Sequence, residues 1–135
     1  MPIDWRGVDP AKLEPQFRTD VEALLGPSAW TWTVLYGLRT GAEQAALYAK
    51  YQAGGPKAAP PGQSPHEYGL AVDIVPDADP DTAGLQPNWN PASPAWQWLF
   101  EAVHRHPRLT SGKAFNDSDH LERYAWRDYK NWRHA

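Results

Sequence analysis

The segment SPHEYGLAVDI, residues 64–74, carries a histidine and an aspartate seven residues apart. The dipeptide Tyr68-Gly69 predicts a tight turn, and the apolar residues around Asp73 predict a buried strand. A buried carboxylate must be hydrogen-bonded, ion-paired or bound to a metal, because an unpaired anion is costly to remove from water. The segment is therefore either a turn followed by a structural strand acid, or half of a metal site in which the turn brings His66 and Asp73 to one edge of a sheet.

A zinc site would need a third ligand, and the chain has no cysteine to supply it. His120 is the strongest candidate, because it starts an extended segment beside three acids in NDSDHLE. His104 and His106 lie at a predicted helix end, and His134 lies in the terminal tail. Three protein ligands leave a fourth position for water, which is the catalytic arrangement of zinc, whereas structural sites are closed by four ligands and often use cysteine. The composition therefore favours metal catalysis over a structural zinc.

Length and composition indicate one domain, residues 1–135, which we expect to be a monomer. The net charge of -3 provides no broad basic field, so we do not expect nucleic acid as a partner. The N-terminus lacks the pattern of a secretory signal, and no apolar stretch approaches the roughly 18 residues of a membrane span. We therefore expect a protein made in the cytoplasm that does not insert into membranes.

Hydrophobic periodicity predicts helices and strands in mixed order. Helical spacing is found in residues 11–26, 40–55 and 94–106, with Thr40 and Glu43 in capping-box positions. Strands are expected at 30–39, at 70–76 and around His120. This pattern is compatible with an α+β fold. The spaced acids Asp77, Asp79 and Asp81 resemble part of a calcium loop, but the glycine and glutamate of such a loop are missing, so an acidic solvated loop is the favoured interpretation.

Three segments in order resemble the motifs of zinc-dependent peptidoglycan peptidases: YGLRTGAEQAALY, PGQSPHEYGLAVDI and DSDHLE. The family comprises D-alanyl-D-alanine carboxypeptidases and L-alanyl-D-glutamate endopeptidases, among them phage endolysins. The resemblance spans about Tyr36 to Glu122. It implies a hedgehog/D-Ala-D-Ala peptidase-like domain in which helices pack a small, mainly antiparallel sheet around an open zinc groove.

Carried over by position, the resemblance implies that His66, Asp73 and His120 bind Zn²⁺. It implies that Asp117 is the catalytic carboxylate, which takes a proton from the attacking water and returns it to the leaving amine. Asp119 and Glu122 stand close enough in sequence to be alternatives for this role. Arg39 corresponds to the family arginine that stabilises the oxyanion or holds the substrate.

The expected function is hydrolysis of an amide bond in the peptidoglycan stem peptide, the expected partner. The L-alanyl-D-glutamate bond is favoured, cleaved by a bacteriolytic phage lysin that reaches the wall after release at lysis or from a virion. A D-alanyl-D-alanine carboxypeptidase is the alternative. An alternative of another class is a non-catalytic, zinc-containing module that binds the cell wall, although the acid at Asp117 beside His120 argues against it.

Overall fold

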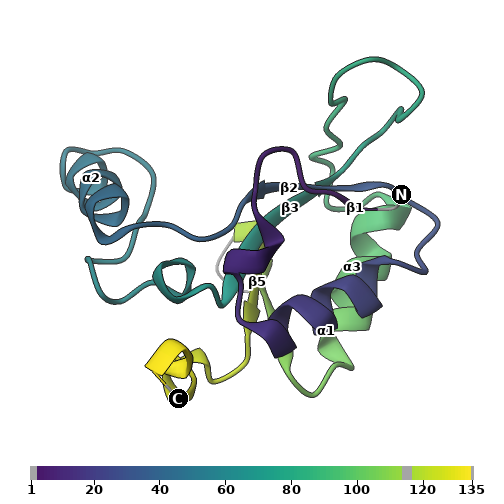
Figure 1. Cartoon of the computed structure of the whole chain (residues 1–135). Coiled ribbons are helices and arrows are strands. Elements are labelled where there is room, and N and C mark those ends of the chain that lie inside the picture. Colours follow the sequence, from purple (N-terminus) through teal and green to yellow (C-terminus); the bar gives the residue numbers. More distant parts are fainter. Residues whose placement is uncertain (1–2, 114–116, 135) are drawn as a thin grey trace.

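The computed structural model describes residues 3–113 and 117–134 and has a five-stranded sheet at its centre (Figure 1). The strands are β1 (Ile3–Asp4), β2 (Trp32–Tyr36), β3 (Ala71–Pro76), β4 (Leu109–Gly112) and β5 (Asp117–Arg123). They lie in the order β1-β2-β3-β5-β4, so β5 lies between β3 and β4. β1 is parallel to β2, and the other three pairs are antiparallel. The expected α+β class with a mainly antiparallel sheet is confirmed.

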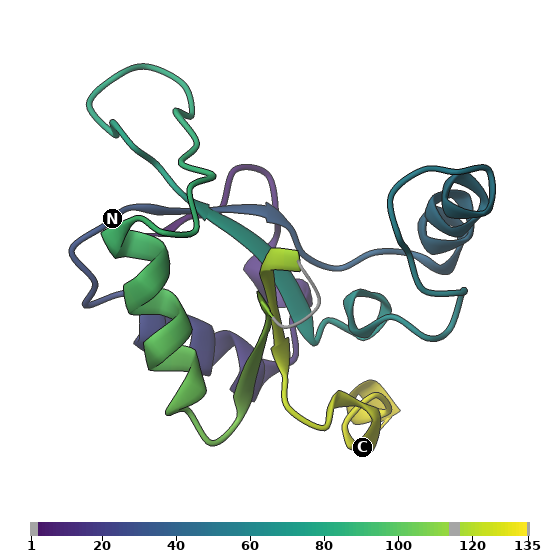
Figure 2. The same ribbon diagram turned by 180° about the vertical axis from the view of Figure 1, so that it is seen from behind.

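Two of the three α-helices lie next to the sheet, and the third stands away from it (Figure 1). The helices are α1 (Pro15–Leu25), α2 (Gly41–Gln52) and α3 (Pro94–His104), with 3-10 turns η1 (Pro10–Lys12), η2 (Pro65–Tyr68), η4 (Trp126–Asp128) and η5 (Trp132–His134). In Figures 1 and 2, α2 stands away from both α1 and α3. Across the described ranges, no helix combines the length and the apolar content that crossing a bilayer requires.

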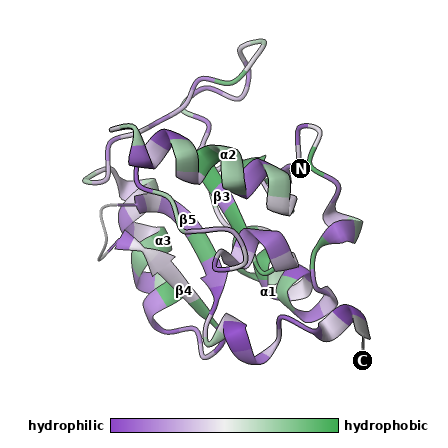
Figure 3. Cartoon of the chain, turned by 90° about the vertical axis from the view of Figure 1, so that its left-hand side faces the viewer, coloured by the Kyte–Doolittle hydropathy of each residue, from purple (hydrophilic) through white to green (hydrophobic). Residues whose placement is uncertain are grey.

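The hydrophobic core forms where α1 and α3 meet the sheet. Phe17, Val21 and Leu25 repeat every four residues along α1 and are buried. From α3, Trp96 meets Trp32 of β2 edge to face, with ring centroids 5.7 Å apart. Each buried side chain of this size contributes about 1.5–3 kcal/mol. Figure 3 shows the hydrophobic residues of β3 at the centre of the molecule. The predicted apolar face of α3 is buried as expected: Trp96, Leu99, Phe100 and Val103.

The first helix starts later than the predicted range 11–26. Its first residue is Pro15, which suits a helix start because the missing N–H would have no intrahelical partner there. The Glu14 carboxylate accepts hydrogen bonds from the backbone N–H groups of Gln16 and Phe17, so it caps the helix. The preceding residues form the short turn η1 instead.

Helix α2 has the expected capping box but little contact with the core. Thr40 accepts a hydrogen bond from the backbone of Glu43, and the Glu43 carboxylate accepts one from the backbone of Thr40. Gln44 is the buried residue of this helix. The attachment of α2 therefore depends on a polar side chain, not on an apolar face.

The aromatic tail packs against η2. Trp126 stacks on Tyr68 with ring centroids 5.6 Å apart, and the Trp132 indole donates a hydrogen bond to the Tyr68 carbonyl. Because Tyr68 ends the turn that carries His66, the tail braces that turn. The connection between β4 and β5 includes residues 114–116, which lie outside the described residues.

The acidic loop after β3 is held by hydrogen bonds between an aspartate side chain and the backbone of the loop. One oxygen of Asp77 accepts hydrogen bonds from the backbone N–H groups of Asp79 and Gln86. Within the part of the chain that the structure describes, these acids do not form a group able to share a metal ion. This geometry agrees with an acidic solvated loop.

Candidate metal centre

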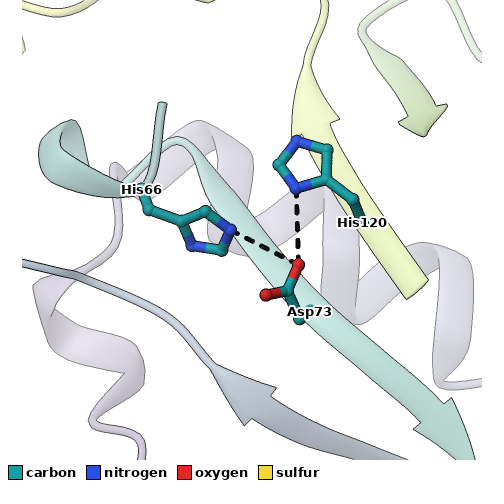
Figure 4. A group of neighbouring side chains, drawn as sticks. All are labelled: His66, Asp73 and His120. Carbon is teal, nitrogen blue, oxygen red and sulfur yellow. Dashed lines mark hydrogen bonds and ion pairs between the residues drawn. The ribbon is translucent and has the colours of Figure 1, made fainter. Parts of the chain in front are cut away.

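Three side chains from separate segments converge on one point (Figure 4). His66 Nε2 and His120 Nδ1 each lie 3.3 Å from Asp73 Oδ1. The ligand atoms that the three residues offer lie within 4.8 Å of one another, and the described residues contain no other such group of His, Asp and Glu side chains. The sequence-predicted trio is therefore assembled in space. The side chains of Asp73 and His120 each remain 14% exposed, so the cluster is reachable from solvent.

Strand pairing sets two of the three positions. Asp73 of β3 lies directly opposite His120 of β5 in the antiparallel ladder. Directly opposite residues share a face of the sheet and have Cβ atoms about 5 Å apart. The buried neighbours Val72 and Ile74 hold Asp73 in the core of the sheet. The same pairing therefore explains why an acid interrupts an apolar strand.

The turn η2 positions the third residue of the cluster, His66. Ser64 caps this turn by accepting a hydrogen bond from the backbone of His66. Gly69 ends it with φ +68°, in the left-handed region, and a Cβ at this position would collide with the backbone of Lys12. Ser64 thus has a structural role in the turn, and Gly69 permits the reversal between His66 and β3.

The His66 ring is oriented by the backbone of the segment after β2. Its Nδ1 lies 2.9 Å from the Gly37 carbonyl oxygen, which can only accept, so Nδ1 carries the hydrogen. Nε2 then faces Asp73 with its lone pair when the ring is neutral. The Arg39 N–H donates to the His66 carbonyl at 3.0 Å, which ties the same two segments together. A metal-ligating histidine usually has its second nitrogen fixed in this manner.

The His120 ring is oriented by a carboxylate. Glu122 Oε1 lies 2.7 Å from His120 Nε2, which leaves Nδ1 facing Asp73. Burial lowers the pKa of His120, but hydrogen bonds to Asp73 and Glu122 outweigh it and raise this pKa to about 10. Glu122 is therefore engaged as the partner of His120. Of the three acids considered for the proton-transfer role, it is the one that pairs with a histidine of the metal centre.

The Asp73 carboxyl is held as an anion. Burial raises its pKa, but the His120 and His66 rings in their protonated form supply hydrogen bonds and positive charge that outweigh burial and keep the pKa well below the usual range. Two imidazoles and one carboxylate are a donor set that zinc accepts, with a further position open to water. The residues present thus fit a metal ion, because their donor atoms are of the right type and lie close to one another.

Arg39 approaches the cluster from the rim. Its Nη2 lies 4.0 Å from Asp73 Oδ2, and its Nη1 donates to Gln44 Oε1 at 2.9 Å. The Gln44 amide in turn donates to the Ala59 carbonyl at 2.7 Å. Gln44 therefore fixes Arg39 relative to both α2 and the following loop. The sequence indicated Arg39, and the structure adds Gln44 as the residue that positions it.

Asp117 and Asp119 form a hydrogen-bonded acidic pair beside the centre. Burial raises the pKa of Asp119 to about 7, and the hydrogen bond with Asp117 and the charge of Asp73 act in the same direction. Asp117, the first residue of β5, is exposed. Both carboxyls thus remain available for proton transfer.

The chain matches the sequence profile of one family, VanY D-alanyl-D-alanine carboxypeptidase, over residues 21–111. The matched region contains Arg39, His66 and Asp73 and ends before His120. No individual curated protein sequence matches the chain significantly.

Solved structures share the fold. The L-Ala D-Glu endopeptidase ChiX from Serratia marcescens has a TM-score of 0.62 at 22% identity, with 90% of this chain and 86% of that chain covered. The vancomycin-resistance D,D-dipeptidase VanXYg, solved with a D-Ala-D-Ala phosphinate analogue, has a TM-score of 0.61 at 13% identity, with 88% and 54% covered. VanYB in complex with D-alanine-D-alanine has a TM-score of 0.51 at 18% identity, with 87% and 75% covered.

These likenesses confirm the peptidase-like fold that the three motifs implied. The family match extends over more than half of the chain, including the segments that bear His66 and Asp73. The chain therefore belongs to the VanY D-alanyl-D-alanine carboxypeptidase family and is a peptidoglycan peptidase, a hydrolase.

Proposed function

We propose that the protein is a zinc metallopeptidase that cleaves the L-alanyl-D-glutamate bond of the peptidoglycan stem peptide. The observation that carries this proposal is the convergence of His66, Asp73 and His120 on one solvent-reachable point. These residues would hold the ion. When bound there, zinc supplies a Lewis acid that polarises the scissile carbonyl and lowers the pKa of water to about 7.

The remaining residues divide the work of charge and proton handling. Arg39 places a fixed positive charge beside the centre, where it stabilises the oxygen of the tetrahedral intermediate. Gln44 keeps the guanidinium in this place through its hydrogen bond to Nη1. Asp117 accepts a proton from the attacking water and returns it to the leaving amine, with Asp119 as the adjacent carboxyl that shares the local charge.

The choice of bond draws on the fold neighbours. The structural alignment with the endopeptidase ChiX covers 90% of this chain and 86% of that chain, so the two proteins are similar in length. The motif resemblance to phage endolysins supports the same bond and a role in bacterial lysis. The family match favours a second candidate, a D-alanyl-D-alanine carboxypeptidase, in which the same centre removes one terminal alanine.

Digestion of purified cell walls distinguishes these activities. Zinc-loaded protein should release new amino termini from the walls and lose this activity on chelation. Mass analysis of the digested muropeptides should show release of the peptide after its first alanine. Loss of a single terminal alanine would instead establish the carboxypeptidase. Walls that bind the protein but stay intact with stoichiometric zinc would contradict both and indicate a binding module.

A further inference from the structure

Tyr36, the last residue of β2, has a large side chain that is exposed to solvent. It is 60% exposed, although it ends a strand whose residues Trp32, Thr33 and Val34 are all buried. An alternation of inward and outward residues would place Tyr36 on the same side as Trp32 and Val34. The exposure of Tyr36 therefore requires a break in the alternation.

A β-bulge supplies that break. Val34 lies opposite Ile74 of β3, yet Tyr36 lies opposite Asp73, so one extra residue is inserted on β2 between these two pairs. Without the bulge, Leu35 would face Asp73. Bulges are enriched beside active sites, where they redirect a side chain. Here the bulge puts Tyr36 on the face of the sheet that carries the metal ligand Asp73.

The result is a row of three residues across three strands. Tyr36 on β2 lies opposite Asp73 on β3, which lies opposite His120 on β5. Directly opposite residues have Cβ atoms about 5 Å apart, so Tyr36 stands next to the metal centre on the side away from His120. The residues that follow it reach the same centre, because the Gly37 carbonyl holds His66 and Arg39 approaches Asp73.

We propose that Tyr36 is a substrate-binding residue whose ring packs against the stem-peptide residue flanking the scissile bond. This inference rests on the proposed function, because it takes the peptide to lie across the metal centre. The stem peptide presents alanine methyl groups next to the cleaved amide, and an exposed aromatic ring offers such groups a flat apolar surface. An exposed aromatic ring aligned with two metal ligands has little to pack against within the chain, and a peptide lying across the metal centre would cover it.

Tyr124 provides a matched control. It is 61% exposed, nearly the same as Tyr36, but it follows the far end of β5. It is four residues beyond His120, which corresponds to about 13 Å along an extended chain. A nonspecific effect of removing an exposed tyrosine should therefore appear in both the Tyr36 and the Tyr124 variants. An effect on peptide binding should appear in the Tyr36 variant alone.

The test compares Tyr36→Ala, Tyr36→Phe and Tyr124→Ala as full-length, zinc-loaded proteins. The substrate is a soluble muropeptide that the wild type cleaves. Tyr36→Ala should raise KM and the dissociation constant of the cleaved peptide, measured by calorimetry, by about tenfold. Its kcat should stay within about twofold of wild type, with zinc content and thermal unfolding unchanged. Tyr36→Phe and Tyr124→Ala should match the wild type in all of these values.

Each other result rejects the inference in a recognisable way. Equal KM values for Tyr36→Ala and Tyr124→Ala would remove Tyr36 from the substrate site while leaving the enzymatic activity intact. A Phe variant as weak as the Ala variant would refute binding through the ring. If the wild type cleaves no muropeptide, the proposed function itself fails, and the role of Tyr36 fails with it.

Discussion

Two aspartates with little solvent exposure, Asp20 on α1 and Asp73 on β3, have different surroundings. Asp20 is enclosed by a fixed set of donors. Arg108 contributes Nε at 2.8 Å and Nη2 at 2.9 Å, one to each carboxylate oxygen, and Gln16 adds a third hydrogen bond at 3.0 Å. These are the lengths of charge-assisted hydrogen bonds in a bidentate pair. The side chain of Asp20 is 4% exposed, and its charge is fully matched within the protein.

Asp73 is surrounded by groups at longer range. His66 and His120 each approach Oδ1 at 3.3 Å, and Arg39 approaches Oδ2 at 4.0 Å. Well-formed N–H···O hydrogen bonds are mostly 2.7–3.2 Å long, so none of these contacts is tight. Low solvent exposure of a carboxylate therefore does not identify its role. Short bidentate contacts mark the structural acid, and several nitrogens at longer distance mark the acid of the metal centre.

The largest expected effect separates the two aspartates by what they bind. Asp73→Asn removes the anionic ligand while keeping the shape of the side chain. Metal affinity should fall by more than the roughly 10- to 100-fold cost of losing an outer partner, and wall hydrolysis should fall to background. Metal analysis after dialysis, with muropeptide release, measures both. The control is Asp20→Asn, which should keep full zinc content; equal zinc in both variants would overturn the comparison.

The acidic pair beside the centre provides the next effect. Asp117→Ala should lower kcat by about 10²- to 10⁴-fold with zinc retained, because a proton-transfer group is lost while the ligands remain. Steady-state kinetics with parallel metal analysis tests this. Asp119→Asn is the matched change, since it removes the neighbouring carboxyl, whose pKa is about 7. If only the Asp119 change abolishes turnover, the proton-transfer role belongs to Asp119.

Much of the centre could be predicted from sequence because its signals are local. The motif around His66 and Asp73 lies within one turn and one strand, and His120 stood out by its acidic neighbours. The role of Glu122 was missed, although residues two apart on a strand share a face. Tyr36 could not be placed, because its direction depends on a bulge in the pairing of β2 with β3.

The role of Asp20 could not be predicted from the sequence, because its partner is distant along the chain. Arg108 lies 88 residues further along the chain, and nothing in the helical pattern of α1 distinguishes an acid with such a partner from a solvated one. Long-range ion pairs of this kind depend on how elements pack, which single residues do not encode.

A moderate effect tests how the metal centre is oriented. Glu122→Gln keeps an acceptor near His120 Nε2 but removes the negative charge. Metal affinity should fall by about 10- to 100-fold, the usual cost of weakening an outer partner, and the fold should be unchanged. Competition with a chelator of known affinity measures the loss. Glu101→Gln, an exposed helix acid, is the control, and an unchanged affinity in Glu122→Gln would show that His120 needs no carboxylate partner.

The smallest effect concerns stability and returns to Asp20. Its ordinary pKa of 3.8 is lowered in the folded protein, mainly by the hydrogen bond from Arg108. The folded state therefore binds fewer protons than the unfolded state as this carboxyl titrates, so the carboxylate stabilises the fold above pH 3.8 and loses this effect as the pH falls through the lower folded value. At pH 6, Asp20→Asn should lower the free energy of unfolding by about 1–3 kcal/mol. Denaturant unfolding at a series of pH values should show this difference shrinking as the pH falls from 3.8 through the lower folded pKa, because only below that folded value do both proteins carry a neutral side chain at position 20. A difference that stays constant down to the lowest pH would mean that Arg108 recognises the shape of Asp20 and not its charge.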